Sequence, residues 1–211
     1  MILLVTGGSA SGKSEYAENR ALQLAKTEKR NLIYLATMMP FGEEAEKRIE
    51  RHRQLRSGKG FKTIERYEDI EGLCAGEDLE AQTFRDQAAD AVVMLECMSN
   101  LTANEMFSDT NSQCADDDKP VSEENTESKN IEHARKKILK GIEALDRVAA
   151  HLVIVSIDVF GEDMQKYDVW TRSYIQCLGA LNQALTMRAD EAVEVVYSIP
   201  VPYKEGKRCS H

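Results

Sequence analysis

The sequence predicts an α/β fold in which a mostly parallel sheet is flanked by helices, within a single domain over residues 1–211. Three observations predict it. Short apolar runs are typical of buried strands, segments of helical periodicity alternate with them, and the length suits one domain with a sizeable core. Strands that alternate with helices usually form a parallel sheet covered on both faces.

Five apolar runs are predicted as strands. They occupy residues 2–5, 32–36, 91–95, 152–157 and 193–197. The first run, residues 2–5, contains no polar residue, which is typical of a buried strand in a parallel sheet. Glu96 ends the third run, and Asp158 lies at the end of the fourth.

Helical periodicity is predicted between these strands. A helix that begins at Ser14 places Ala17, Ala21 and Leu24 on one face. Three further helices are predicted over residues 43–56, 131–150 and 164–188.

Residues 108–130 differ in composition from the rest of the chain. They contain no aromatic residue and collect many carboxylates, including the run of Asp116, Asp117 and Asp118. Such a segment cannot bury enough apolar surface to offset the entropy of ordering it. We therefore expect a mobile acidic insertion within the domain.

Composition excludes several classes of protein. The formal net charge of −9 argues against a general nucleic-acid binder. The five cysteines are an odd number without a CxxC pair, so neither a zinc site nor a disulfide framework is expected. No apolar segment reaches the length of a membrane span. We expect a cytoplasmic protein without a nucleic-acid partner.

The strongest motif follows the first predicted strand. It fits the pattern G-x-x-x-x-G-K-[ST] and lies between a strand and a helix, as a phosphate-binding loop must. The loop consists of Gly7, Gly8, Ser9, Ala10, Ser11, Gly12, Lys13 and Ser14. Glycines let backbone N–H groups turn toward phosphate, Lys13 would neutralise β- and γ-phosphate charge, and Ser14 would ligate Mg²⁺. The motif predicts ATP or GTP binding with Mg²⁺ in a P-loop NTPase-like (RecA-like) fold.

A phosphate loop usually has an acidic partner at the end of a nearby strand, which holds Mg²⁺ directly or through water. Glu96 and Asp158 both end predicted strands. The sequence does not decide which of the two lies beside the loop, so both remain candidates.

A basic segment forms the third feature. In the predicted helix over residues 43–56, Arg48, His52 and Arg56 are spaced four apart and share one face. Such a cluster suits an anion, and a neutral imidazole within it is a possible nucleophile toward phosphorus. From the residues alone, a solvated basic helix with an incidental histidine is the favoured interpretation.

Matches to a known family extend over nearly the whole chain. They comprise residues 2–8, 11–14, 34–37, 48–49, 52, 61, 63–65, 95–97, 101, 104, 179, 181–183, 189–191 and 199–200. In this combination and order the chain resembles the adenosylcobinamide kinase / adenosylcobinamide-phosphate guanylyltransferase family of cobalamin biosynthesis.

The resemblance implies two reactions. The terminal phosphate of ATP or GTP passes to adenosylcobinamide, and GMP from GTP then passes through a guanylylated histidine to give adenosylcobinamide-GDP. By motif position that histidine is His52. Nucleotide contacts would come from Arg48, Arg51, Glu65 and Glu96, and Arg48, Arg51 or Arg56 could stabilise the pyrophosphate leaving group. The resemblance also implies a homo-oligomer, specifically a trimer.

The chain departs from the family pattern at three places. Ala10 stands where the family usually has arginine, residues 157–161 replace Asn-Glu-Val-Gly, and residues 174–176 replace Phe-Arg-Asp. These differences bear on corrinoid recognition and on the balance of the two activities. Lys13 and His52 match the pattern.

Two other functions fit the motifs. One is a P-loop kinase or nucleotidyltransferase with a different acceptor. The other is a nucleotide-binding regulatory module without turnover. A histidine at the guanylylation position argues against the second, because a switch does not need it.

Overall fold

Seven strands form one sheet in the computed structural model, in the order β3-β2-β4-β5-β1-β6-β7. The structure describes residues 1–107, 123–158 and 166–205, apart from the side chains of residues 44, 45, 48, 55 and 123–130. The strands are β1 (Ile2–Thr6), β2 (Asn31–Ala36), β3 (Phe61–Glu65), β4 (Ala91–Glu96), β5 (His151–Val155), β6 (Glu191–Val196) and β7 (Ile199–Lys204). All neighbours pair in parallel except β6 and β7, which form an antiparallel hairpin.

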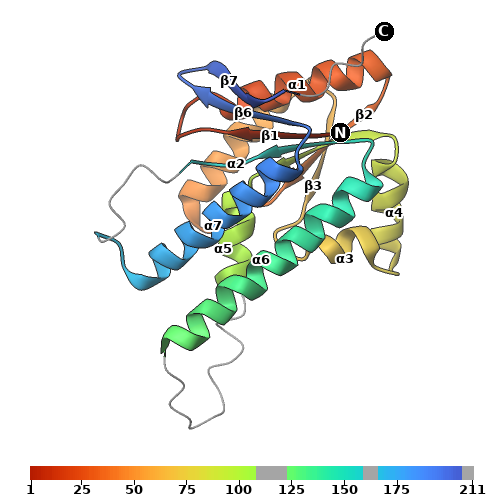
Figure 1. The fold of residues 1–211 in the computed structure, drawn as a ribbon. Helices are drawn as coiled ribbons and strands as arrows, with labels where there is room; N and C mark the ends of the chain where they lie inside the picture. Colours follow the sequence, from red (N-terminus) through yellow and green to blue (C-terminus); the bar gives the residue numbers. More distant parts are fainter. Residues whose placement is uncertain (108–122, 159–165, 206–211) are drawn as a thin grey trace.

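Seven helices accompany the sheet in the described residues. They are α1 (Lys13–Glu28), α2 (Gly42–Arg56), α3 (Ile70–Ala75), α4 (Leu79–Ala88), α5 (Met98–Phe107), α6 (Glu123–Val148) and α7 (Val169–Arg188). Figure 1 shows α1 on one side of the sheet and α6 and α7 on the other. The prediction of a mostly parallel sheet flanked by helices is confirmed.

The core has two parts because successive strand residues point to opposite faces. Leu3 and Val5 pack with Ala17 and Ala21 of α1 on one face. Leu4 and the apolar residues of α3 to α7 pack on the other face. This double burial explains the unbroken apolar runs by which the inner strands were predicted.

Two strands and three short helices were not predicted. In β3, Lys62, Thr63 and Glu65 are exposed, so this edge strand lacks an apolar run. In β7, Pro200 and Pro202 are residues that ordinarily argue against a strand. The sequence analysis did not assign α3, α4 or α5 to any element.

Two predicted helices begin elsewhere. Helix α6 starts at Glu123, so residues 123–130 are helical and do not belong to an irregular insertion. Glutamate and lysine are good helix formers, and carboxylates are favourable at the positive amino end of a helix. Helix α7 starts at Val169, where Asp168 caps it by accepting a hydrogen bond from the Thr171 N–H group. The rest of the predicted insertion, residues 108–122, lies outside the described residues.

The prolines of β7 occupy equivalent places in the hairpin. Pro200 is opposite Val195 and Pro202 is opposite Val193, with Val201 between them opposite Glu194. Residues two apart in a strand direct their backbone groups to the same side. Because proline carries no N–H donor, neither residue can donate a backbone hydrogen bond to a neighbouring strand.

Cys74, Cys97 and Cys177 are free thiols, as expected, whereas Cys114 and Cys209 lie outside the described residues. Within the described part of the chain, no helix combines the length and apolar character that a membrane crossing requires.

Candidate active site

The phosphate-binding loop connects β1 to α1, as predicted. Gly7 and Gly12 have φ angles of 149° and 91°, which residues with a side chain rarely adopt. A Cβ atom on Gly7 would lie 2.5 Å from the Val195 carbonyl oxygen, and one on Gly12 would lie 2.6 Å from Ser198 Oγ. These two positions therefore require glycine for conformation and for space.

The turn of the β6–β7 hairpin contacts the phosphate-binding loop. The Ser198 N–H group donates a hydrogen bond of 2.8 Å to the Ser11 carbonyl oxygen. Tyr197 and Ser198 form the hairpin turn with φ angles of 50° and 64°, in a left-handed conformation that such turns need and that glycine or asparagine usually supplies. The hairpin turn therefore has a strained backbone conformation at the place where it contacts the phosphate-binding loop.

Two polar groups of the loop are available to a ligand. Lys13 Nζ donates to the Gly8 carbonyl oxygen at 3.0 Å. Burial lowers the pKa of Lys13, while the nearby Cys97 and Glu96 act in the opposite direction. The Ser11 hydroxyl is buried without a hydrogen-bond partner. A half-buried cation beside an unsatisfied hydroxyl fits the charge and acceptor oxygens of a phosphate group.

The structure distinguishes between the two acidic candidates. Ser14 Oγ donates to Glu96 Oε1 at 2.5 Å, and the Tyr34 hydroxyl donates to Glu96 Oε2 at 3.1 Å. Asp158 approaches the loop through its backbone, whose N–H group donates to the Gly7 carbonyl oxygen at 3.2 Å. The Asp158 side chain is exposed and lines a separate cavity of about 360 Å³. Glu96 is the carboxylate beside Ser14.

No group of three or more His, Cys, Asp or Glu residues that could hold a metal is present among the described residues. A magnesium ion at this site would therefore take few ligands from the protein. Ser14 and Glu96 supply the hard oxygen atoms that Mg²⁺ prefers, and phosphate oxygens and water would complete its octahedron. The residues fit a metal that arrives with a nucleotide.

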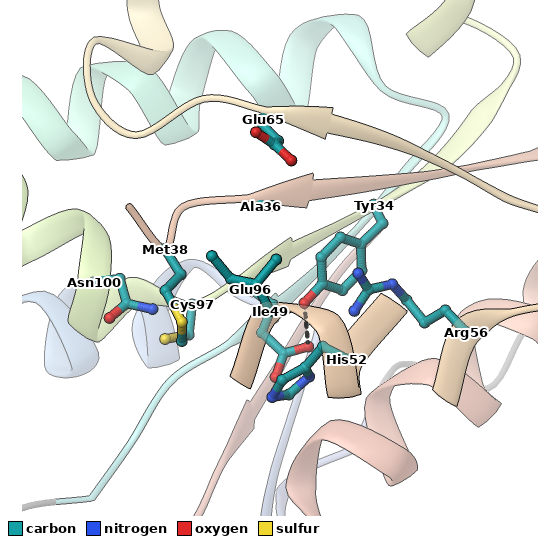
Figure 2. Close-up of a pocket in the computed structure, with 10 residues that line it drawn as sticks. All are labelled: Tyr34, Ala36, Met38, Ile49, His52, Arg56, Glu65, Glu96, Cys97 and Asn100. Atoms are coloured by element: carbon teal, nitrogen blue, oxygen red, sulfur yellow. Dashed lines mark hydrogen bonds between the residues drawn. The ribbon is translucent and has the colours of Figure 1, made fainter. Parts of the chain in front are cut away.

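His52 lines a cavity of about 60 Å³ next to the loop. Figure 2 shows how the cavity is built from α2 and from the carboxyl ends of β2 and β4. Its lining residues are Tyr34, Ala36, Met38, Ile49, His52, Arg56, Glu65, Glu96, Cys97 and Asn100. The Glu96 carboxylate therefore lines the pocket that contains His52 and also contacts Ser14 of the phosphate-binding loop.

The other predicted nucleotide contacts lie at different places. Glu65 is at the pocket, where hydrogen bonds from Tyr67 and Arg53 hold the pKa of its carboxyl group below the usual value. Arg51 is exposed and lines a shallow groove with Glu50 and other residues of α2, away from the pocket. The side chain of Arg48 lies outside the described residues.

Sequence reasoning did not select Tyr34, Met38, Cys97 or Asn100. Tyr34 is buried, and this burial raises its pKa. A signal was present, because these residues lie in or just beyond β2 and β4, and parallel strands end at one edge of the sheet where ligands bind. The sequence does not show that β2 and β4 are neighbours in the sheet, so it could not place these four residues in one pocket.

The fold and the loop together define a class. A mostly parallel sheet, with a glycine-rich loop that leads from β1 into α1 and a carboxylate on β4, is a P-loop NTPase-like (RecA-like) nucleotide-binding domain. In this arrangement β5 lies between the loop strand and the strand that carries Glu96.

The chain belongs to the cobinamide kinase / cobinamide phosphate guanyltransferase family, whose family model matches residues 3–203. It is 30% identical over 205 residues to the bifunctional adenosylcobalamin biosynthesis protein CobU of Escherichia coli strain K12, covering 97% of this chain and 100% of the relative. The protein of the same name from Salmonella typhimurium strain LT2 is 27% identical over 204 residues, again covering 97% and 100%.

Two solved structures show a distant likeness to this chain. The flagellar accessory protein FlaH from Methanocaldococcus jannaschii has a TM-score of 0.46 and 10% identity, covering 97% of this chain and 78% of that chain. The ATPase domain of G40P has a TM-score of 0.44 and 13% identity, covering 92% and 68%.

Proposed function

We propose that this protein phosphorylates adenosylcobinamide with ATP or GTP and then transfers GMP from GTP, through guanylylated His52, to give adenosylcobinamide-GDP. One observation carries the proposal. His52 and Glu96 line the same pocket, and Glu96 also contacts Ser14 of the phosphate loop. A single bound triphosphate could therefore lie within reach of both the loop and the histidine. Membership of the family and the two curated relatives support the same pair of activities.

The first reaction uses the loop. The acceptor hydroxyl oxygen attacks the γ-phosphorus, the bond to the β-phosphate breaks, and the nucleoside diphosphate and a proton are released. Phosphoryl transfer depends mainly on positioning and on charge neutralisation. The loop amides and Lys13 would hold the phosphates, and Mg²⁺ on Ser14 and Glu96 would neutralise the developing charge.

The second reaction uses the pocket. A ring nitrogen of His52 forms a bond to the α-phosphorus of GTP, and the bond to the β-phosphate breaks, so that pyrophosphate leaves. The phosphate oxygen of cobinamide phosphate then displaces the imidazole and takes the GMP group. Covalent catalysis of this kind divides one displacement into two easier steps.

The proposal extends to the assembly and location of the protein. The family resemblance suggests a homo-oligomer, and specifically a trimer, in the cytoplasm. Size-exclusion chromatography with light scattering would give the mass of the assembly and so test the trimer.

The experiment follows the label from GTP labelled at the α-phosphate, in the presence of Mg²⁺. We expect a covalent GMP adduct on the wild-type protein and none on His52→Ala. The exposed His133 provides a matched control, because His133→Ala should form the adduct normally. In parallel, transfer of label from γ-labelled ATP to adenosylcobinamide should persist in His52→Ala.

Two results would contradict the proposal at different levels. An adduct on His52→Ala would show that another residue carries GMP. The absence of any corrinoid product from the wild-type protein, with either nucleotide, would remove the assigned acceptor and leave a P-loop enzyme of other specificity.

A further inference from the structure

Arg56 carries a charge into the interior of the protein. It ends α2, and only 7% of its surface is exposed. Its Nε and Nη1 atoms are buried and have no hydrogen-bond partner. A buried cation whose donors are unsatisfied is unfavourable, so such a group is a strong indication of a missing anion.

An aromatic ring holds the guanidinium group in place. The central carbon of the Arg56 guanidinium lies 3.4 Å from the centroid of the Tyr34 ring. Phe61 packs edge-on against the Tyr34 ring, with ring centroids 6.3 Å apart. Stacking of this kind orients a planar guanidinium but leaves its in-plane N–H groups free to bind oxygen atoms.

Arg56 and His52 face the same cavity. They are four residues apart in α2, which places them on one face of the helix, and both line the cavity of about 60 Å³. Figure 2 shows the Arg56 side chain extended over Tyr34, and His52 and Glu96 line the same pocket. A cavity of this size holds a few water molecules or one phosphate group.

The carboxylates of the pocket already have partners. Glu96 accepts hydrogen bonds from Ser14 and Tyr34. Glu65 accepts from Arg53 at 2.6 Å and from Tyr67 at 2.8 Å. Neither carboxylate satisfies the Nε and Nη1 donors of Arg56, which remain for an incoming anion.

We infer that Arg56 is a catalytic residue of guanylyl transfer, which binds the non-bridging oxygens of the α-phosphate while His52 attacks it. The inference rests on the proposed function and deepens it. As the bond from the imidazole nitrogen to phosphorus forms and the bond to the β-phosphate breaks, pyrophosphate departs with the bonding electrons, and the imidazole proton passes to solvent. Arg56 acts through its charge and two directed hydrogen bonds.

This role separates Arg56 from the loop residues. Lys13 and Ser14 lie at the β- and γ-phosphates and serve both reactions. Arg56 lies on α2 with the histidine nucleophile and serves only the reaction in which the α-phosphorus is attacked. A defect at Arg56 should therefore be selective.

The test measures two rates on each variant. For Arg56→Met, which keeps the length of the side chain without its charge, we expect formation of the His52–GMP adduct to slow by about 100-fold or more. For Arg56→Lys, which keeps the charge without the planar fork, we expect a smaller loss of about tenfold. The rate of phosphate transfer from ATP to adenosylcobinamide should change by less than about threefold, because γ-phosphate chemistry takes place at the loop.

Two further variants exclude a merely structural effect. In Arg56→Ala, added methylguanidinium should restore part of the rate of adduct formation in a saturable manner. A neutral additive of similar size should not restore it, because such an additive could repair only the packing. The matched control is Arg188→Met, which removes an arginine that pairs with Glu143 and does not line the pocket, so it should keep the adduct rate.

The outcomes are distinct. A wild-type rate of adduct formation in Arg56→Met would overturn the inference and leave the proposed function intact. Equal losses of both activities in Arg56→Met and Arg56→Lys, without rescue in Arg56→Ala, would assign Arg56 a structural role and also overturn it. Absence of an adduct on the wild-type protein would instead refute the proposed guanylyl transfer itself.

Discussion

The hydroxyl oxygen of Ser14 lies 2.5 Å from Oε1 of Glu96, although 82 positions of the chain separate them. The sheet creates this contact. The loop follows β1 and Glu96 ends β4, and because parallel strands end at one edge, the two side chains meet across the intervening β5. Glu96 in turn binds Tyr34, on whose ring Arg56 is stacked. The phosphate loop and the histidine pocket therefore share one carboxylate.

The first prediction concerns the metal. Glu96→Gln should raise the Mg²⁺ concentration needed for ATP binding by about 10- to 100-fold, because the amide keeps the shape of the side chain but loses its charge and one of its two acceptor oxygens. Asp158→Asn is the matched control, since the Asp158 carboxylate lines a different cavity. Titration of Mg²⁺ at fixed ATP, with fluorescent nucleotide displacement, measures the effect. A larger loss in the Asp158 variant would reverse our assignment.

The second prediction concerns protons taken up with the nucleotide. Burial lowers the pKa of Lys13, so the free protein loses the Lys13 proton at a lower pH than an exposed lysine does. A bound triphosphate favours the charged form and raises this pKa again. Binding should therefore take up protons through Lys13, and the uptake should grow as the pH rises toward the pKa of the free protein's Lys13. Calorimetry in buffers of different ionisation enthalpy measures the uptake.

Lys13→Arg serves as the control for proton uptake, because an arginine stays charged throughout this pH range. Its binding should show no uptake at about pH 9. Equal uptake in the two proteins would mean that another group takes the proton.

The third prediction concerns the two kinds of glycine in the loop. Gly12→Ala should lower the free energy of unfolding by about 1–3 kcal/mol, because the new Cβ atom would meet Ser198 in a left-handed backbone. Gly8→Ala should change it by less than about 0.5 kcal/mol, since no atom lies within 4 Å of its Cβ position. Urea unfolding without nucleotide measures both. Similar values for the two variants would count against the described loop conformation.

The fourth prediction concerns the anchoring of α2. Lys59, just beyond α2, forms a salt bridge of 2.5 Å with Glu18 of α1, whose side chain is only 5% exposed. Lys59→Met should destabilise the protein by about 2 kcal/mol, because it leaves a buried carboxylate unpaired. Since Lys59 holds the end of the helix that carries His52, adduct formation should slow as well.

The double variant Lys59→Met, Glu18→Met tests the cause. Removal of both charges should recover most of the lost stability. If the double variant is as unstable as Lys59→Met alone, the loss arises from packing and not from the unpaired carboxylate. Thermal unfolding followed by circular dichroism provides the comparison.

The inner strands could be predicted because each contains a short, mainly apolar run, a property that the residues carry locally. The edge strands could not. In β3 exposed polar residues remove the signal, and in β7 Pro200 and Pro202 contradict it. The sequence predicts that residues 123–130 belong to the acidic insertion, but they form the start of α6, because glutamate and lysine favour helices even in an acidic segment.

The residues of the candidate site also divide into those that local sequence predicts and those that it does not. The phosphate loop is contiguous, so its residues and their spacing predict its conformation. The shared face of His52 and Arg56 follows from helix periodicity alone. The choice between Glu96 and Asp158 depends on strand order and on side-chain direction, which are properties of the whole sheet. The unsatisfied donors of Arg56 could be found only once the packing around Tyr34 was known.

The prolines of β7 have a consequence for how copies of this protein can meet. A strand laid along that edge would find no N–H donor at Pro200 or Pro202, so it could not form a regular ladder there. Exposed apolar side chains, among them Ile199 and Tyr203, nevertheless stand on the same strand. A second molecule at this edge of the sheet must therefore bind through side chains. The prolines prevent a continuous intermolecular sheet along β7, and with it open-ended polymerisation through this edge.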